Sequence, residues 1–223
     1  KLAGIGLGSS VKTVAYESVN TVTNKGKEAW DKGSGMPSIW ILGMYKPSPT
    51  TTIIVPVQNA KPGDKVVTDT YFGKVPASRL QQRGNLVLFR GDGQYRSKIG
   101  IPPAYAFPRA GSYDPIGRIL TIIEFSLPKG ATDYVNSLWE IQDKPFGGDA
   151  VNSYNDGPPA PGKKPLGPFY ELESSSPAAA LAPGKSITHI HRTMHFIGSE
   201  AELDKIAQRL LGANLKVVRS TFK

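Results

Sequence analysis

All three histidines of the chain lie within seven residues, as His189, His191 and His195. On an extended strand, side chains at even spacing share one face, so the segment 187–195 would present these imidazoles together. Neutral imidazoles in this arrangement can chelate a transition-metal ion such as zinc, iron or nickel. They can also contact a sugar or transfer protons, or they can form a polar strand face packed under a loop. The spacing alone leaves these alternatives open.

Two carboxylates, Glu171 and Glu173, show the same spacing further upstream. Both should lie on one face of a strand, where they are either solvated or line a cleft. We expect the odd-numbered side chains of 169–173 and of 187–195 to face one shared hollow. That hollow would bring the acids and the imidazoles together for sugar binding or proton transfer.

Other segments supply aromatic, amide and cationic side chains. Trp139, beside Glu140, could stack on a sugar ring or belong to the core. The loop 152–157 is dense in hydrogen-bonding groups, which either contact sugar hydroxyls or form ordinary turns. Arg96 and Lys98 share a strand face and either hold a carboxylate or phosphate or form a solvated edge. The predicted substrate-binding residues are Arg96, Lys98, Trp139, Glu140, Asn152, Tyr154 and Asp156.

The elements that would position these residues are short, β-branched or alternating segments separated by turn residues. One helix is predicted between Ser199 and Gly212, because Ser199 and Glu202 form a capping box. Residues 143–168 are rich in Gly, Pro, Asn and Asp and are predicted to form a long loop. The segments predicted to be strands are 11–23, 38–45, 50–57, 86–89, 95–99, 119–127, 134–141, 169–174, 186–197 and 215–218. This order predicts an all-β, mostly antiparallel sandwich with one short helix near the C-terminus.

Composition narrows the function classes. The 223 residues suffice for a single β-sandwich domain spanning 1–223, and the scattered 24 Gly and 19 Pro indicate many turns. The absence of Cys excludes disulfides, Cys-zinc sites and a thiol nucleophile. The net charge of +9 is spread among acids with no long basic run, so we expect no nucleic-acid partner. No apolar stretch is long enough to predict a membrane span.

Six segments together resemble a family of uncharacterised bacterial proteins, usually exported, whose fold is the galactose-mutarotase-like β-supersandwich. The resemblance covers roughly residues 11–197. It implies a periplasmic or secreted protein, of which this chain, which opens at Lys1, is the C-terminal part. The segments are 38–43 (SIWILG), 71–76 (YFGKVP), 95–100 (YRSKIG), 134–142 (YVNSLWEIQ), 152–158 (NSYNDGP) and 167–177 (GPFYELESSSP).

The wider superfamily includes aldose 1-epimerases, which place a Glu general base before a Leu-x-Pro-Gly turn like the one at 181–184. The resemblance therefore implies Glu171 or Glu173 as the base. The epimerases take their His acid from a mid-chain Asn-His motif, whereas no His precedes residue 189 here. Either His189 or His191 substitutes, or a segment outside this chain supplies the acid, or the chain does not run this reaction.

The sequence thus predicts a carbohydrate-binding protein with its site on a concave sheet face. The first alternative is a mutarotase-like enzyme in which Glu171, Glu173, His189 and His191 supply the catalytic groups. The second is a metal-binding β protein that uses the three imidazoles. A carbohydrate is the expected partner, no cofactor is predicted, and the sequence does not determine the oligomeric state.

Overall fold

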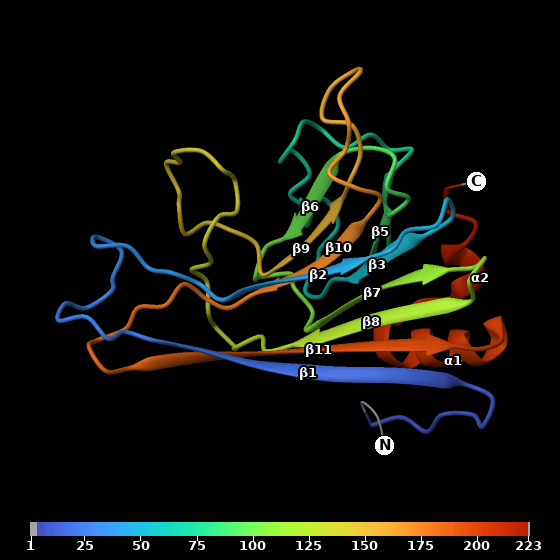
Figure 1. Ribbon diagram of the computed structural model, residues 1–223, viewed down its shortest axis with the longest axis horizontal. Helices are drawn as coiled ribbons and strands as arrows, with labels where there is room; N and C mark the ends of the chain where they lie inside the picture. Colours follow the sequence, from blue (N-terminus) through green and yellow to red (C-terminus); the bar gives the residue numbers. More distant parts are fainter. Residues whose placement is uncertain (1–3, 223) are drawn as a thin grey trace.

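The protein consists of two antiparallel β-sheets packed face to face, with a layer of helices on one side (Figure 1). The structure is a computed structural model that describes residues 4–222. The larger sheet has the order β1-β11-β8-β7-β3-β5-β4, and the smaller one has the order β2-β10-β9-β6. The larger sheet consists of β1 (Lys12–Thr23), β3 (Thr52–Pro56), β4 (Leu80–Arg83), β5 (Leu86–Arg90), β7 (Arg109–Asp114), β8 (Ile119–Phe125) and β11 (Ser186–Ile197). The smaller sheet consists of β2 (Trp40–Tyr45), β6 (Ser97–Ile101), β9 (Val151–Asn155) and β10 (Tyr170–Ser175).

Both faces of the larger sheet carry a packed layer over its central strands. One face packs on the smaller sheet through a core that includes Ile53, Phe89, Ile99 and Leu172. The opposite face packs on the helices α1 (Glu200–Leu211) and α2 (Leu215–Val218) through side chains such as Met194, Phe196, Leu203 and Leu210. Because successive side chains of a strand alternate between its faces, a single strand contributes side chains to both cores. The all-β, mostly antiparallel class with a short C-terminal helix is confirmed.

The helix α1 begins where the sequence predicts. The Ser199 side chain accepts a hydrogen bond from the backbone N–H of Glu202, and Gly212 closes the helix with φ 65°. A left-handed conformation of this kind favours glycine because a Cβ would clash there. The apolar stripe of α1 lies on the larger sheet. No helix within residues 4–222 is both long and apolar enough to cross a bilayer.

Three local predictions are wrong. Residues 134–141 form no strand, because Tyr134 is buried in an isolated bridge to Gly147 while the rest of the segment has no partner strand. The predicted loop 143–168 contains the buried strand β9. Residues 215–218 form the helical turn α2 rather than a strand, because the Asn214 side chain caps it by accepting from Val217 N–H.

The strand β1 forms one edge of the larger sheet and pairs along its whole length with β11 (Figure 1). The side chains of Val14, Tyr16 and Val19 are exposed along it. The strand β11 carries the three histidines in register with β1 and is flanked on its other side by β8. The histidines are therefore held in the interior of the larger sheet rather than in a loop.

Candidate functional site

A cavity of about 470 Å³ opens on the outer face of the four-stranded sheet, the face turned away from the larger sheet. Its residues come from all four strands of that sheet and from irregular segments, chiefly 134–142 and 156–169. The cavity is lined by Trp40, Leu42, Phe72, Arg96, Lys98, Ser137, Trp139, Tyr154, Asp156, Gly157, Pro159, Lys164, Leu166, Phe169 and Glu171.

Strand alternation brings the charged side chains to this face. On β10, Tyr170 and Leu172 belong to the core between the sheets, and the Tyr170 hydroxyl lies 2.7 Å from Ser112 Oγ of the larger sheet. The odd-numbered Glu171 and Glu173 therefore point outward. The same rule directs Lys98 of β6 outward.

An ion pair lies beneath the cavity floor. Lys98 Nζ is 2.8 Å from Glu173 Oε2, and the two side chains are 6% and 0% exposed. The indole N–H of Trp40 donates to the same oxygen at 2.9 Å. The Lys98 ammonium also lies 5.0 Å from the centre of the Trp40 ring and 5.4 Å from that of Tyr71. Because removal of either charge would leave the other buried without compensation, these groups form one electrostatic unit.

Glu171 and Glu173 form a carboxyl pair. Burial, followed by the negative charge of Glu173, raises the pKa of Glu171 to about 7. Glu173 Oε1 is buried and has no hydrogen-bond partner among the described residues. The nearby negative charge disfavours ionisation of Glu171, which favours its protonated form. The site thus holds a proton near neutral pH at the edge of the cavity.

A second buried acid supports the floor from behind. Asp149 accepts hydrogen bonds from the Tyr71 hydroxyl at 2.5 Å and from Thr68 Oγ1 at 3.2 Å. Asn152 Nδ2 donates to the Tyr71 hydroxyl at 3.0 Å. Burial raises the pKa of Asp149 to about 6 despite these hydrogen bonds. Burial also raises the pKa of Tyr71, so its hydroxyl stays protonated and remains a donor.

Aromatic side chains form the walls. The Tyr154 ring lies 5.8 Å from Phe72 and 5.7 Å from Phe169, measured between ring centres. The Tyr154 hydroxyl donates to Asp156 Oδ1 at 2.9 Å, and Asp156 Oδ2 accepts from the Gly167 backbone N–H at 2.8 Å. This buried aspartate thus ties the loop after β9 to the cavity wall.

Two side chains extend the walls toward solvent. Trp139 is 92% exposed although it lines the cavity. The Arg96 guanidinium lies 3.9 Å from the centre of the Phe72 ring. Gly157 allows the chain to pass close to Arg96, because a Cβ at that position would lie 2.5 Å from the Arg96 backbone nitrogen. The rim therefore combines an exposed indole with a stacked cation.

The imidazoles lie on the other side of β10. Ser174 Oγ, which points into the space between the sheets, is 2.8 Å from His189 Nε2 and 2.8 Å from His191 Nδ1. The prediction of one hollow shared by acids and imidazoles is therefore wrong. Glu171 and Glu173 point away from the larger sheet, while both imidazoles lie between the two sheets. The alternation expected within each strand holds, but the faces of β10 and β11 that meet carry Ser174 rather than the acids.

Burial lowers the pKa of both His189 and His191 to about 4. Both are thus neutral at physiological pH. His195 is engaged separately, with its Nδ1 3.0 Å from Thr121 Oγ1. Among residues 4–222, no group of three His, Cys, Asp or Glu side chains could hold a metal ion, so the alternative of a three-histidine metal site does not form.

Most of the predicted sugar-binding residues do gather at the cavity. Asn152 lies beneath its floor, and Glu140 is exposed and does not line it. Trp40, Tyr71, Phe72, Asp149 and Phe169 also belong to the site but were not among the predicted residues. Trp40 and Leu42 alternate along a predicted strand, and this pattern could have indicated that Trp40 shares a face with the site. Tyr71 and Asp149 join the site only through contacts between segments that are distant in the sequence.

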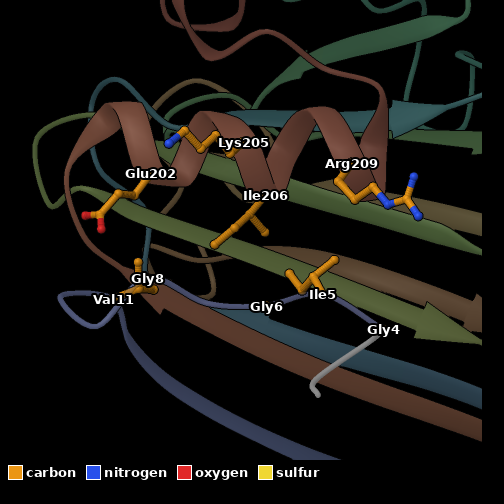
Figure 2. Close-up of a pocket in the computed structure, with 9 residues that line it drawn as sticks. All are labelled: Gly4, Ile5, Gly6, Gly8, Val11, Glu202, Lys205, Ile206 and Arg209. Carbon is orange, nitrogen blue, oxygen red and sulfur yellow. The ribbon is translucent and has the colours of Figure 1, made fainter.

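A smaller cavity of about 380 Å³ lies between the N-terminal segment and α1 (Figure 2). Glu202, Lys205 and Arg209 line it from α1, and Gly4, Ile5, Gly6 and Gly8 line its other side. None of these three charged side chains is buried, and Glu202 is held by hydrogen bonds from Ser10 and Ser199. This cavity therefore lacks the buried charges that distinguish the first one.

Two solved structures show a likeness to the chain. The Slr1438 protein from Synechocystis sp. PCC 6803 aligns with TM-score 0.49 and 11% identity, over 81% of this chain and 50% of that one. The protein described as "a Putative aldose 1-epimerase" from Escherichia coli K12 aligns with TM-score 0.46 and 16% identity, over 86% of this chain and 67% of that one. The chain thus spans half of the first structure, and both likenesses concern the fold alone. No curated protein sequence matched.

A sequence model of one family matches almost the entire chain, over residues 1–222, and the family is described as a "Family of unknown function (DUF6786)". This match confirms the expected resemblance to an uncharacterised family. The chain belongs to the family of unknown function DUF6786.

Proposed function

We propose that the protein binds a saccharide in the cavity on the outer face of the four-stranded sheet. The observation that carries the proposal is the presence, in one cavity, of an exposed indole at the rim and a buried carboxyl–ammonium set at the floor. A pocket that combines apolar walls with a few fixed polar groups is typical of a small-molecule site.

The aromatic walls suit the apolar faces of a sugar ring. The C–H groups on those faces carry partial positive charge, which complements the negative face of an aromatic ring. Trp139, Phe72 and Phe169 reach the cavity from three separate segments. Trp139 buries little of its own surface in the free protein, so contact with a ligand would remove a large apolar area from water.

The floor suits sugar hydroxyls. Each hydroxyl both donates and accepts, so it pairs with a carboxyl oxygen or an ammonium N–H. Glu171 lies at the cavity surface, and Lys98 lines it while remaining bound to Glu173. Hydrogen bonds to charged groups are about twice as strong as neutral ones, which favours recognition of hydroxyl positions.

Titration calorimetry against a panel of oligosaccharides tests the proposal, with Trp139→Ala as the site variant. Binding that weakens in this variant supports it. Failure of every saccharide to bind the folded protein would overturn it. We place this binding outside the cytoplasm, as the family resemblance implies, and fractionation of the bacterium would test that localisation.

A second candidate function is acid–base catalysis on the bound sugar. Glu171 favours it, because a carboxyl group with a pKa of about 7 can both donate and accept a proton near neutral pH. His189 and His191 cannot act on a ligand in this cavity, since they lie on the opposite face of β10. Polarimetry of freshly dissolved aldoses tests this function. An accelerated optical change that is lost in Glu171→Gln supports it, and the spontaneous rate across all sugars excludes it.

A further inference from the structure

The two cations that share the outer face of the smaller sheet have different electrostatic surroundings. The Lys98 ammonium is bound to the Glu173 carboxylate and is almost fully buried, so its charge is neutralised within the protein. Arg96, two residues earlier, is only partly buried and lines the cavity. None of the ion pairs found within residues 4–222 includes Arg96 or Lys164, which lies on the same cavity.

The Arg96 guanidinium is held in place without a carboxylate partner. It stacks on the Phe72 ring at 3.9 Å, and Phe72 packs against Tyr154, whose hydroxyl donates to Asp156. Stacking leaves the N–H groups at the edge of the guanidinium plane available. A preorganised guanidinium loses less conformational entropy when it binds a ligand than a free side chain does.

The floor and the rim of the cavity have opposite preferences. The floor carries Glu171 next to Glu173, and a ligand anion there would meet two carboxyl groups. The rim carries Arg96 and the exposed Lys164. When Glu171 is protonated, the cations around the cavity exceed the anions by one, because Lys98 is balanced by Glu173 and one of the two rim cations by Asp156. A ligand with a single negative charge at the rim would complete the balance.

We infer that the ligand is an acidic saccharide whose carboxylate binds Arg96 at the rim while its hydroxyls face the carboxyl pair at the floor. This inference rests on the proposed sugar-binding function and narrows its substrate class to uronate-containing sugars. The planar guanidinium matches the planar carboxylate in a two-point hydrogen bond. A sulfated saccharide offers an oxyanion as well and serves as the competing ligand in the test.

Titration calorimetry with matched pairs of trisaccharides tests the inference. Each pair consists of a galacturonate, glucuronate or mannuronate trisaccharide and its carboxyl-reduced, neutral counterpart. We expect at least one acid to bind roughly tenfold more tightly than its neutral form, the gain expected for a charge-assisted hydrogen bond. Arg96→Gln should abolish this ratio, measured as the affinity of the acid over that of its neutral form in the same variant. Arg83→Gln, which changes an exposed arginine away from the cavity, should leave the ratio unchanged.

The outcomes separate this inference from the function on which it rests. Neutral trisaccharides that bind as tightly as the acids overturn the inference and leave the sugar-binding function standing. Tighter binding of sulfated trisaccharides than of uronates overturns the carboxylate assignment. A ratio that survives in Arg96→Gln overturns the role of Arg96. If neither acidic nor neutral saccharides bind the folded protein, both proposals fail.

Discussion

Lys98 and Glu173 form a 2.8 Å ion pair between β6 and β10, strands that are not neighbours in the sheet. The strand β9 lies between them, so the lysine side chain reaches across it. Both groups are shielded from water, and Trp40 donates a further hydrogen bond to the carboxylate. Because the pair joins two separated strands beneath the cavity floor, its loss should affect both stability and the shape of the cavity.

Replacement of Lys98 by Met should lower the free energy of unfolding by about 3–5 kcal/mol, because it leaves the Glu173 carboxylate buried without its counter-charge. Urea denaturation measures this change. The control is Lys32→Met, which breaks an exposed pair whose side chains are 65% and 41% accessible. That variant should change stability by less than about 1 kcal/mol. Equal losses in the two variants would contradict the account.

The stability of the Glu171→Gln variant should increase relative to that of the natural protein as pH rises. Between about pH 4.5 and 7, the folded chain holds a proton on Glu171 and the unfolded chain does not, so the natural protein loses stability over this interval. Glutamine stays neutral and loses nothing there. We expect a relative gain on the order of 2 kcal/mol between about pH 4 and pH 8, measured by urea denaturation. A pH-independent difference would show that Glu171 titrates normally.

Acid should destabilise the protein through the buried imidazoles. The unfolded chain binds protons on His189 and His191 below about pH 6.5, whereas the folded chain does so only below about pH 4. The unfolding free energy contributed by this pair is therefore fully present above pH 6.5 and is lost as pH falls toward 4.

The double variant His189→Gln/His191→Gln isolates this contribution, since Glu171 and Asp149 act in the opposite direction in both proteins. Its unfolding free energy should decrease less steeply between about pH 6.5 and pH 4 than that of the natural protein. Thermal or urea unfolding across this range measures the two slopes. Parallel slopes would mean that the imidazoles become protonated within the folded state.

Truncation of Trp139 should affect ligand binding far more than folding. The side chain is 92% exposed and lines the cavity, so Trp139→Ala should weaken saccharide binding by about tenfold, the loss expected when an aromatic contact is removed. The melting temperature should barely change. Ile141→Ala is the matched control, because Ile141 is fully exposed in the same segment but does not line the cavity. Similar binding by both variants would remove Trp139 from the site.

Local sequence pattern predicted the long strands and the helix well. The histidine-bearing strand and α1 carry strong local signals, namely alternation over many residues and a capping box. The short strands β4 and β7 escaped prediction because their sequences, LQQR and RAGSYD, lack β-branched residues and become strands only through pairing with neighbours.

The set of residues that meet at the site was harder to predict from the sequence than the strands and the helix. Alternation placed Glu171 and Glu173 on one face and His189 and His191 on one face, and both statements hold within each strand. Which faces meet depends on how the two sheets stack, and local sequence carries no signal for that. The contact between the Tyr71 hydroxyl and Asp149 likewise joins segments 78 residues apart.

The central position of β10 in the smaller sheet limits which insertions and deletions the protein can tolerate. Its neighbours β2 and β9 fix it on both sides, and Tyr170 and Leu172 point into the core while Glu171 and Glu173 point outward. A slip of one residue would turn Glu171 and Glu173 into the apolar layer between the sheets and expose Tyr170 and Leu172 to water. Single-residue insertions or deletions within 170–175 should therefore prevent folding, whereas length changes in the exposed segment 158–166 should leave folding intact and alter only the cavity wall.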